Sequence, residues 1–520
     1  MNSALFYDFI RAVASQAKNF SARRERIIYR FLEMLPGLLI WSVFGLAVFL
    51  SRFQPLWVAF FIIAFDLYWL FKIVYFSFHT RSAYRRMKEY LRRDWVAELQ
   101  ALSNTWVNPK GIWHLIILPM HKEPYEVIQP AIEGIAQAHW PKERMIVVLA
   151  AEEAAGDEAW QIVSRIYDEN KNKLSNLFLT KHPEGLPGEI PGKGSNERWA
   201  GIWIKENFID RNNIPYEHII VSSLDADTVV APHYFSCLAY HYLTSKKPLR
   251  SSFQPVPLFL NNIWQAPAIS RVMAFSSTFW HMMNQERPEK HITFSSHALP
   301  FKALVDIGFW QPDVVSEDSR VFWQCFLHYN GDYRVVSMHY PVSMDANVAS
   351  THIKTLKNVY KQQRRWAYGV ADIAYFLFGF LKKHKEIPKK LMWQYGFYTI
   401  EGFFSWGTHA ILIFALGWLP LVLGGQNFNA TILSYSLPRV TQTLLIIAMI
   451  GLMASIFLSF LLLPPRPAGE EKFKYFFMVL QWVLVPVTLI IFGSFPAIEA
   501  QTRLMLGRRL GFWPTEKYRK

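Results

Sequence analysis

The sequence predicts a mostly parallel α/β domain joined to membrane-crossing helices. Apolar runs long enough to cross a bilayer, which takes about 20 residues, lie near both ends of the 520-residue chain. Between them, short apolar strand candidates alternate with amphipathic helix candidates, which is typical of a parallel sheet covered on both faces. The composition agrees, because 52% hydrophobic and 16% aromatic residues are high fractions for a soluble protein.

The first segments are a basic stretch over 1–33 and an apolar helical hairpin over 34–78. The basic stretch does not look like a cleaved signal. Basic residues flank both ends of the hairpin, so the positive-inside rule places both ends in the cytosol. Asp66, inside the second apolar run, costs about 2.5–3.5 kcal/mol in lipid and should face protein or water. It serves either as a packing hydrogen bond or as part of a polar passage.

Residues 92–350 have the character of a soluble domain. Four strands are expected, and helices are expected between them over 126–139, 160–173 and 196–208. In such sheets ligands bind beyond the carboxyl ends of the strands. A further helix is expected from Gln324 and a strand over 333–338. The four strand candidates are Trp113–Pro119, Arg144–Ala151, Leu177–Lys181 and Ile219–Val221.

The rest of the chain divides into three parts. Residues 351–390 are basic and amphipathic, which suits the membrane surface, 391–499 hold three apolar segments, and 500–520 form a basic tail. Three crossings would leave this tail outside the cytosol, whereas its charge predicts the inside. Either one segment is re-entrant or interfacial, or one apolar run contains two crossings. The candidates are the Gly- and Pro-interrupted run over 391–423 and the last segment, broken at Pro486.

Two explanations account for the formal net charge of +15 better than nucleic acid binding does. Lys and Arg collect beside membrane segments, and a basic face attracts anionic lipids or phosphorylated substrates. Because the positive charge follows the membrane flanks, no nucleic acid partner is expected. Cys237 and Cys325 are far apart and are expected to be buried thiols without a disulfide.

An acidic pair, Asp225-Ala226-Asp227, ends the fourth strand candidate. Two carboxylates at a strand end suit a hard divalent cation, Mg²⁺ or Mn²⁺, that is shared with a substrate's phosphates. Such a pair alone is usually only solvated. Other short motifs accompany it in order: Pro119 to Pro124 (PMHKEP), Lys193 to Asn196 (KGSN), Ser316-Glu317-Asp318, Gln362 to Trp366 (QQRRW) and Phe512 to Lys517 (FWPTEK).

In this order and spacing, the motifs resemble the membrane-embedded family 2 glycosyltransferases, namely the cellulose, chitin and hyaluronan synthases and their relatives, over roughly Trp113 to Lys520. The resemblance implies a cytosolic GT-A domain. It also implies that Asp225 and Asp227 bind the metal and the donor's diphosphate, with Lys193 and Asn196 near the diphosphate. Glu123 would help to hold the nucleotide.

The resemblance further implies that Asp318, beside Glu317, is the general base for the acceptor hydroxyl. Acceptor-binding residues would be Gln362, Arg365 and Trp366, and a loop that closes over the nucleotide would carry Phe512, Thr515 and Lys517. The chemistry suits these residue types. A leaving diphosphate needs a cation and basic groups as its charge develops. The hydroxyl needs a carboxylate to take its proton, and one displacement with one base inverts the anomeric carbon.

Each motif also has a simpler interpretation. Glu317 and Asp318 could merely begin a helix, Arg365 and Trp366 could anchor the membrane interface, and Lys517 could belong to a plain basic tail. The chain also departs from the family pattern. Glu152 and Glu153 stand where the family has an Asp pair for the nucleotide's base and ribose, His121-Lys122 replaces Tyr-Asn, and Pro514 replaces Val.

Together these features predict an inverting glycosyltransferase in the cell membrane. The expected donor is a UDP-sugar, and the expected acceptor is a carbohydrate. The sequence leaves open whether the product is polymerised and passed through the helices or whether a single sugar is transferred. The alternative is a lipid or lipid-linked acceptor. A non-enzymatic transporter or scaffold is a third hypothesis, which predicts no metal-dependent nucleotide binding. His409 and Glu401, in the first C-terminal apolar segment, are expected to be packing or interface groups.

Overall fold

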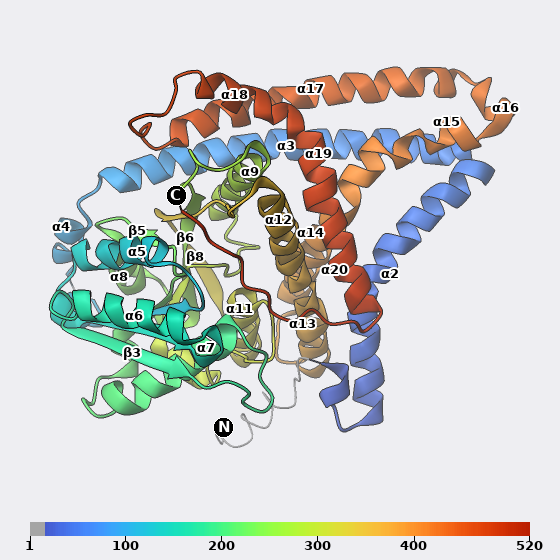
Figure 1. Cartoon of the computed structure of the whole chain (residues 1–520). Coiled ribbons are helices and arrows are strands. Elements are labelled where there is room, and N and C mark those ends of the chain that lie inside the picture. The colour runs from blue at the N-terminus through green and yellow to red at the C-terminus, as the bar shows by residue number, and fades with distance from the viewer. Residues whose placement is uncertain (1–15, 104, 520) are drawn as a thin grey trace.

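An α/β domain and a set of long helices make up the computed structural model, which describes residues 16–103 and 105–519 (Figure 1). The domain contains one eight-stranded mixed sheet in the order β3-β2-β1-β4-β7-β6-β8-β5. Neighbours among the first four are parallel, and β6 is parallel to β8. The strands are β1 Trp113–Met120, β2 Met145–Glu152, β3 Asn176–His182, β4 Ile219–Ser223, β5 Val229–Val230, β6 Ser251–Phe259, β7 Ala298–Pro300 and β8 Arg334–Met344.

Both faces of the sheet are buried, as the near-continuous apolar runs predict. Alternate residues of β1 enter different cores because strand side chains alternate in direction. Leu115 and Ile117 join the core that includes α7 and α11, whereas Ile116 and Leu118 join the core beneath α5 and α8. The helices of the domain are α4 Trp95–Gln100, α5 Tyr125–Gln137, α6 Asp157–Asn170, α7 Lys193–Ile204, α8 Tyr234–Thr244, α10 Phe301–Asp306 and α11 Glu317–His328.

Strand β6 lies in a region whose sequence gave no clear secondary-structure signal. It contains Pro255 and Pro257, and proline is disfavoured inside a sheet because it cannot donate a ladder hydrogen bond. The pairing with β8 shifts register between Gln254 and Val256, which accommodates the first proline. Strand β8 likewise continues to Met344, six residues beyond the predicted end at Met338.

The chain has four helical segments long and apolar enough to cross a membrane, counted over the described residues. A fifth candidate is the pair α14 (Lys389–Phe414) and α15 (Leu419–Leu423), bent by 48°. Helices α3 and α17 lie side by side, and α2 diverges from α3 beyond their shared turn (Figure 1). The four segments are α2 Arg23–Phe53, α3 Pro55–Arg92, α17 Ile432–Leu462 and the broken helix Lys474–Met505.

Asp66 is buried between α3 and α17, where its Oδ2 accepts a hydrogen bond of 2.9 Å from Thr441 Oγ1. This contact is the packing hydrogen bond that was expected as one of the two roles, although Oδ1 has no hydrogen-bond partner among the described residues. Such a bond lets a carboxyl group lie inside an apolar bundle, because the polar atom meets a donor instead of lipid.

The last apolar segment begins and ends against elements that adjoin the α/β domain. It consists of α18 (Lys474–Leu480), short 3-10, α (α19, Val485–Val487) and π turns, and α20 (Phe495–Met505). Near its start Trp482 packs on Phe275 and Phe279 of α9 (Ala268–Gln285). At its end, the carbonyl of Leu504 accepts a 2.9 Å hydrogen bond from Arg30, near the start of α2. Figure 1 shows this segment crossing from the α3–α17 pair to α2.

Residues 351–382 form two helices instead of one long helix. Helix α12 (His352–Ala367) ends at the 3-10 turn Tyr368–Val370, and α13 (Ala371–Lys382) follows. Helix α13 packs on α2 and α11. This packing is anchored by a buried ion pair, in which Arg320 Nε lies 2.7 Å from Asp372 Oδ1.

Candidate active site

The motif residues gather beyond the carboxyl ends of the parallel strands. Strand β1 leads to Glu123, β2 ends at Glu152, and β4 leads to Asp225. Lys193 is the first residue of α7, and its ammonium contacts Asp225, so it faces the same edge of the sheet. Ligands of such sheets bind at this edge.

Lys193 joins two acidic motifs that are far apart in the sequence. Its Nζ lies 2.8 Å from Asp225 Oδ1 and 2.8 Å from Asp318 Oδ1. Glu197 and Glu317 are 3.8 and 3.9 Å from the same nitrogen. Burial opposes the charged ammonium, but the four carboxyl groups outweigh it and raise the pKa of Lys193 well above its ordinary value. The strand-end aspartate and the Glu-Asp motif therefore face one small volume.

Asp225 is fixed by two donors. Ser295 Oγ donates a 2.6 Å hydrogen bond to its Oδ2, and Lys193 pairs with its Oδ1. Although burial acts to raise the pKa of this carboxyl, Lys193 and Lys517 lower it well below its ordinary value. Asp225 is thus negatively charged throughout the physiological pH range.

The second aspartate of the pair is more deeply buried. Asp227 Oδ2 accepts a 3.1 Å hydrogen bond from the backbone N–H of Asp345, which follows β8. Its Oδ1 lies 2.7 Å from Lys517 Nζ. Burial raises the pKa of Asp227 to about 6, with Asp345 and Asp225 adding to the effect and Lys517 opposing it.

The C-terminal tail runs from α20 across the α/β domain to this site (Figure 1). Phe512 lies on Gly192, whose φ of 146° is a conformation that glycine adopts readily; a Cβ there would overlap the phenyl ring. Lys517 pairs with Asp227, and Arg519 Nη2 pairs at 2.5 Å with Asp345 Oδ1. Thr515 Oγ1 is buried without a hydrogen-bond partner among the described residues.

Glu317 and Asp318, both at the start of α11, differ in access. The Asp318 side chain is 22% exposed, whereas that of Glu317 is only 1% exposed. Burial raises the pKa of Glu317 to about 7, with the neighbouring Asp318 as the second cause. The geometry therefore leaves Asp318 as the carboxylate that a bound molecule can reach.

The expected nucleotide-holding residues lie at or just beyond the carboxyl ends of β1 and β2. Glu123 Oε2 accepts a 2.7 Å bond from the backbone of His121, and His121 Nδ1 lies 3.2 Å from Glu152 Oε2. Glu153 is exposed and turned toward the next loop, where it accepts from the backbone N–H of Glu184. Of Glu152 and Glu153, which stand where the family has an Asp pair, only Glu152 therefore faces the other motif residues.

Asn196 lies behind the site rather than in it. Its amide donates a 2.7 Å hydrogen bond to the carbonyl of Ala150 in β2, and the residue is fully buried. Its Oδ1 has no partner among the described residues. The side chain therefore joins α7 to the sheet, which positions Lys193 one turn earlier.

The residues of the Gln-x-x-Arg-Trp motif lie on α12. Arg365 stacks over the Phe512 ring, 5.2 Å from its centroid, and so contacts the tail. Gln362 accepts a long bond of 3.4 Å from Asn347, and Trp366 packs near Phe259. The motif thus borders the tail and the loop after β8.

Several residues of the site were not predicted from the sequence. Asp345 follows a strand as Asp225 does, so its position at a strand end is a signal that could have found it. Ser295, His297 and Glu197 have no such signal. His297 is fully buried with Nδ1 3.6 Å from Asp318, and Glu197 accepts from Ser223 at the end of β4.

A comparison with protein families identifies the chain. Residues 220–493 match the model described as glycosyl transferase family group 2. The chain belongs to this family. It is therefore a glycosyltransferase, and its sheet is the nucleotide-binding GT-A type that the family predicts. No curated protein sequence matches the chain.

Solved structures resemble this glycosyltransferase only distantly. A mannosyltransferase from Pyrobaculum calidifontis, solved with GDP-Man and Mn²⁺, is 14% identical, covers 86% of this chain and 100% of its own, and has a TM-score of 0.42. S. aureus TarS 1–349 with UDP-GlcNAc is 14% identical over 65% of this chain and 90% of its own, with a TM-score of 0.31. GalNAc-T7 with UDP, GalNAc and Mn²⁺ is 10% identical over 58% of each chain, at 0.33.

The residues of this family member offer two carboxylates to a divalent cation, and a substrate's phosphates would complete its coordination. Among the described residues, no group of three or more His, Cys, Asp or Glu side chains is arranged to hold a metal ion. Asp225 and Asp227, however, offer carboxylate oxygens, and the ammonium groups of Lys193 and Lys517 already occupy cationic positions against them. Two carboxylates plus substrate phosphates is a usual Mg²⁺ arrangement.

Proposed function

We propose that this glycosyltransferase is an inverting enzyme of the cell membrane that transfers a sugar from a UDP-sugar to a carbohydrate acceptor. One observation carries the proposal. Lys193 Nζ is 2.8 Å from both Asp225 and Asp318, so the proposed diphosphate site and the proposed base are adjacent. This adjacency is what a displacement at the anomeric carbon requires, because the leaving group and the incoming hydroxyl meet at one carbon.

In the proposed reaction Asp318 takes the proton of the acceptor hydroxyl. The hydroxyl oxygen bonds to the anomeric carbon while the bond from that carbon to the diphosphate oxygen breaks. Lys193 and Lys517 stabilise the negative charge that develops on the diphosphate. A divalent cation on Asp225 and Asp227 would supply further electrophilic stabilisation of the leaving group. One displacement inverts the anomeric centre.

The donor and acceptor would occupy opposite sides of Lys193. We assign the nucleotide to Glu123 and Glu152 at the ends of β1 and β2, and the acceptor to Gln362, Arg365 and Trp366 of α12. Phe512, Thr515 and Lys517 would cover the bound donor. Asn196 acts on the diphosphate only indirectly in this scheme, because its amide is bound to β2.

A polar seam between α3 and α14 supports a carbohydrate that enters the membrane helices. Its α3 residues are 68, 72, 75 and 79 and its α14 residues are 398, 401, 405 and 409, spacings that place each set on one helix face. Lys72 Nζ lies 2.5 Å from Glu401 Oε1, which also accepts from Tyr68 and Ser405. Charged groups at such depth are costly and mark substrate pathways.

The seam continues toward the α/β domain. The guanidinium of Arg287, which follows α9, lies 5.0 Å from the Tyr75 ring and 5.8 Å from the Tyr398 ring. At the other end His409 stacks on Trp69. His409 packs on Trp69 as expected, whereas Glu401 would also serve the carbohydrate path in a processive, synthase-like activity.

The proposed topology has both ends in the cytosol. Four crossings, α2, α3, the bent pair α14–α15, and α17, return the chain to the side of the α/β domain. The last segment then lies along that side, because Trp482 and Leu504 both contact elements adjoining the domain. We divide the chain accordingly, with the domain over 92–350, the interfacial region over 351–390 and the membrane segments over 34–78 and 391–499.

The test is a transfer assay with purified protein, Mn²⁺ and a panel of labelled nucleotide sugars, UDP-sugars first. Label that moves into water-soluble product supports the carbohydrate acceptor. Label extracted into organic solvent identifies the alternative, a lipid or lipid-linked acceptor. Absence of transfer from every donor, together with no metal-dependent UDP binding by calorimetry, overturns the proposal and leaves a transporter or scaffold.

A further inference from the structure

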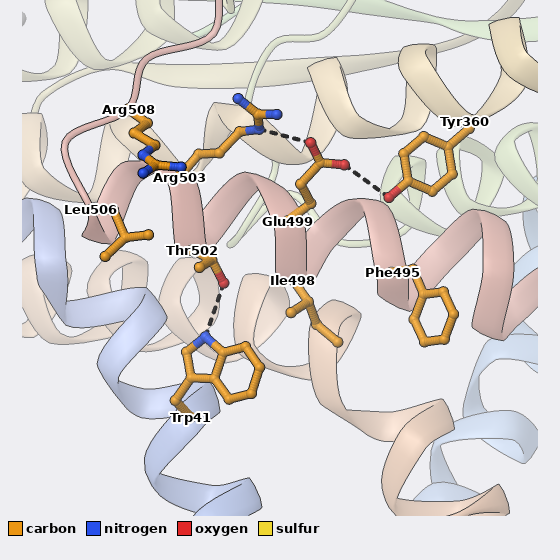
Figure 2. A pocket seen from close by; sticks show the side chains of 9 residues that line it. All are labelled: Trp41, Tyr360, Phe495, Ile498, Glu499, Thr502, Arg503, Leu506 and Arg508. Carbon is orange, nitrogen blue, oxygen red and sulfur yellow. Dashed lines mark hydrogen bonds and ion pairs between the residues drawn. The ribbon is translucent and has the colours of Figure 1, made fainter.

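A pocket of about 440 Å³ opens on the surface between α2, α12 and α20, remote from Lys193 (Figure 2). Its apolar part is made by Trp41 of α2 and by Phe495, Ile498 and Leu506 of the α20 segment. Arg503 and Arg508 line its other part, and Figure 2 shows their side chains on the same side of α20. The pocket is therefore amphipathic, with apolar and cationic walls.

Positive charge in the pocket exceeds negative charge. The single carboxylate, Glu499, already accepts hydrogen bonds from Tyr360 at 2.9 Å, Arg364 at 2.6 Å and Arg503 at 2.7 Å. Arg508 is exposed and has no acidic partner among the described residues. Glu499 is thus shared by Arg364 and Arg503 while Arg508 has no acidic partner in the described part of the chain, and this excess of positive charge favours an anion.

In the proposed topology the arginine side of the pocket lies at the lipid headgroups, because Arg30, near the cytosolic start of α2, binds the carbonyl of Leu504 beside Arg503. Trp41 is 48% exposed and its Nε1 donates a 2.9 Å hydrogen bond to Thr502 Oγ1, the amphipathic arrangement of an interfacial tryptophan. Further exposed arginines lie at the start of α2 and after the end of α20. Phe495 and Leu506 are 46% and 57% exposed, and acyl chains would cover them.

We propose that this pocket binds an anionic phospholipid, whose phosphate lies between Arg503 and Arg508 and whose acyl chain lies along Trp41, Phe495 and Leu506. The apolar wall favours a lipid over a free phosphate ion, which would leave these side chains uncovered. The inference does not depend on the proposed transfer reaction, because it uses only the membrane segments and their charges.

The test is native mass spectrometry of the full chain in detergent, titrated with phosphatidylglycerol or phosphatidylcholine. The wild type retains phosphatidylglycerol in preference to phosphatidylcholine. The double variant Arg503→Gln/Arg508→Gln binds it roughly thirtyfold more weakly, the loss expected for two arginines near an anionic surface. Arg508→Gln alone, at an exposed position, weakens binding roughly fivefold and covers the case in which the double variant does not fold.

The matched control is Arg466→Gln/Lys472→Gln, which removes the same charge from the exposed loop before α18. This control retains phosphatidylglycerol as the wild type does. The proposal is overturned if the wild type retains both lipids equally or if the control loses as much phosphatidylglycerol as the pocket variants. It is also overturned if the pocket variants retain phosphatidylglycerol as the wild type does. Displacement of phosphatidylglycerol by an equal concentration of glycerol 3-phosphate also overturns it, because a free phosphate would then be the ligand.

Discussion

At the residue scale, the site is a set of lysine–carboxylate pairs that a bound donor must rearrange. Lys517 holds Asp227 at 2.7 Å, and Lys193 holds Asp225 and Asp318. A divalent cation at the aspartate pair would compete with these ammonium groups for the same oxygens. Before the donor binds, these lysines therefore keep the aspartates charged and ordered. They also lower the affinity of the aspartates for a metal ion as long as no donor is bound.

This competition makes a prediction for metal binding without nucleotide. Lys517→Ala is expected to bind Mn²⁺ several-fold more tightly than the wild type, since Asp227 is freed, whereas Asp227→Asn is expected to lose binding. Affinity should fall as the pH drops through about 6, because burial raises the pKa of Asp227 to that value and the metal needs the carboxylate. Calorimetry measures all three effects, and Lys472→Ala on an exposed loop is the control. Unchanged affinity in Lys517→Ala would contradict the competition.

Glu317 makes a prediction for stability against pH. Burial raises its pKa to about 7 from an ordinary value of 4.5. Between these values the folded chain keeps a proton that the unfolded chain releases, so stability falls as the pH rises through this window. Glu317→Gln is expected to flatten that fall in thermal unfolding of detergent-solubilised protein, whereas the exposed Glu158→Gln is not. An equal slope in Glu317→Gln and the wild type would refute the buried-acid interpretation.

At the element scale, the motifs work because helix and strand ends bring them together. Strand β4 carries Asp225, α7 begins with Lys193 and α11 begins with Glu317 and Asp318. The order of the motifs along the chain identified these elements through the family resemblance. Their distances could not be read from the sequence, because strand order in the sheet is not the chain order.

The sequence predicted the regular strands better than the irregular ones. Strands β1 to β4 have continuous apolar runs, and each predicted range overlaps the observed one. Strand β6 was missed because Pro255 and Pro257 are unfavourable in a ladder. The register shift between Gln254 and Val256 accommodates Pro255, and Pro257 lies opposite Val342 of β8. The division of 351–382 into α12 and α13 depends on packing of α13 against α11 and α2, which the helical pattern alone does not reveal.

The buried pair Arg320–Asp372 holds α11 against α13 and so fixes the element that carries Asp318. Ser319 Oγ also donates to Asp372 Oδ2 at 2.6 Å. Asp372→Ala leaves an unpaired buried guanidinium and is expected to destabilise the fold by about 3–5 kcal/mol. Asp168→Ala removes an exposed pair with Lys171 and should cost less than about 1 kcal/mol. Denaturation in detergent measures the difference, and equal costs would contradict the anchoring role.

At the scale of the whole molecule, one chain places the α/β domain, the membrane seam and the C-terminal tail in contact. The resemblance predicted an α/β domain with flanking apolar helices, and it placed Lys517 in the same site as Asp227, from which its Nζ lies 2.7 Å. It did not predict that Asp345 and Arg519 fix the end of the tail, because neither belongs to the motifs quoted. Both segments that the topology prediction left open are irregular: Lys389–Phe414 and Leu416–Leu423 are bent by 48°, and Lys474–Met505 is a broken helix. Only the folded chain reveals the bend and the breaks.

If the carbohydrate follows the polar seam, a change in the seam should shorten the product without slowing sugar transfer. Lys72→Leu/Glu401→Leu removes a charged pair from α3 and α14 with no change in net charge. If the carbohydrate follows the seam, the double variant is expected to make shorter products while it transfers sugars from the donor at a similar rate. Gel analysis of labelled product gives the length distribution, and Arg439→Leu on the exposed face of α17 is the control. Products of wild-type length in the double variant would exclude the seam as the path.

The central claim is that carboxylates from separate motifs act on one donor, with Asp318 as the base. The most direct measurement compares sugar transfer by Asp318→Asn and the wild type while UDP binding is followed by calorimetry. The account predicts that transfer falls by at least about 10²-fold and that metal-dependent UDP binding is retained, with the exposed Asp157→Asn unchanged in both. Full transfer by Asp318→Asn would contradict it.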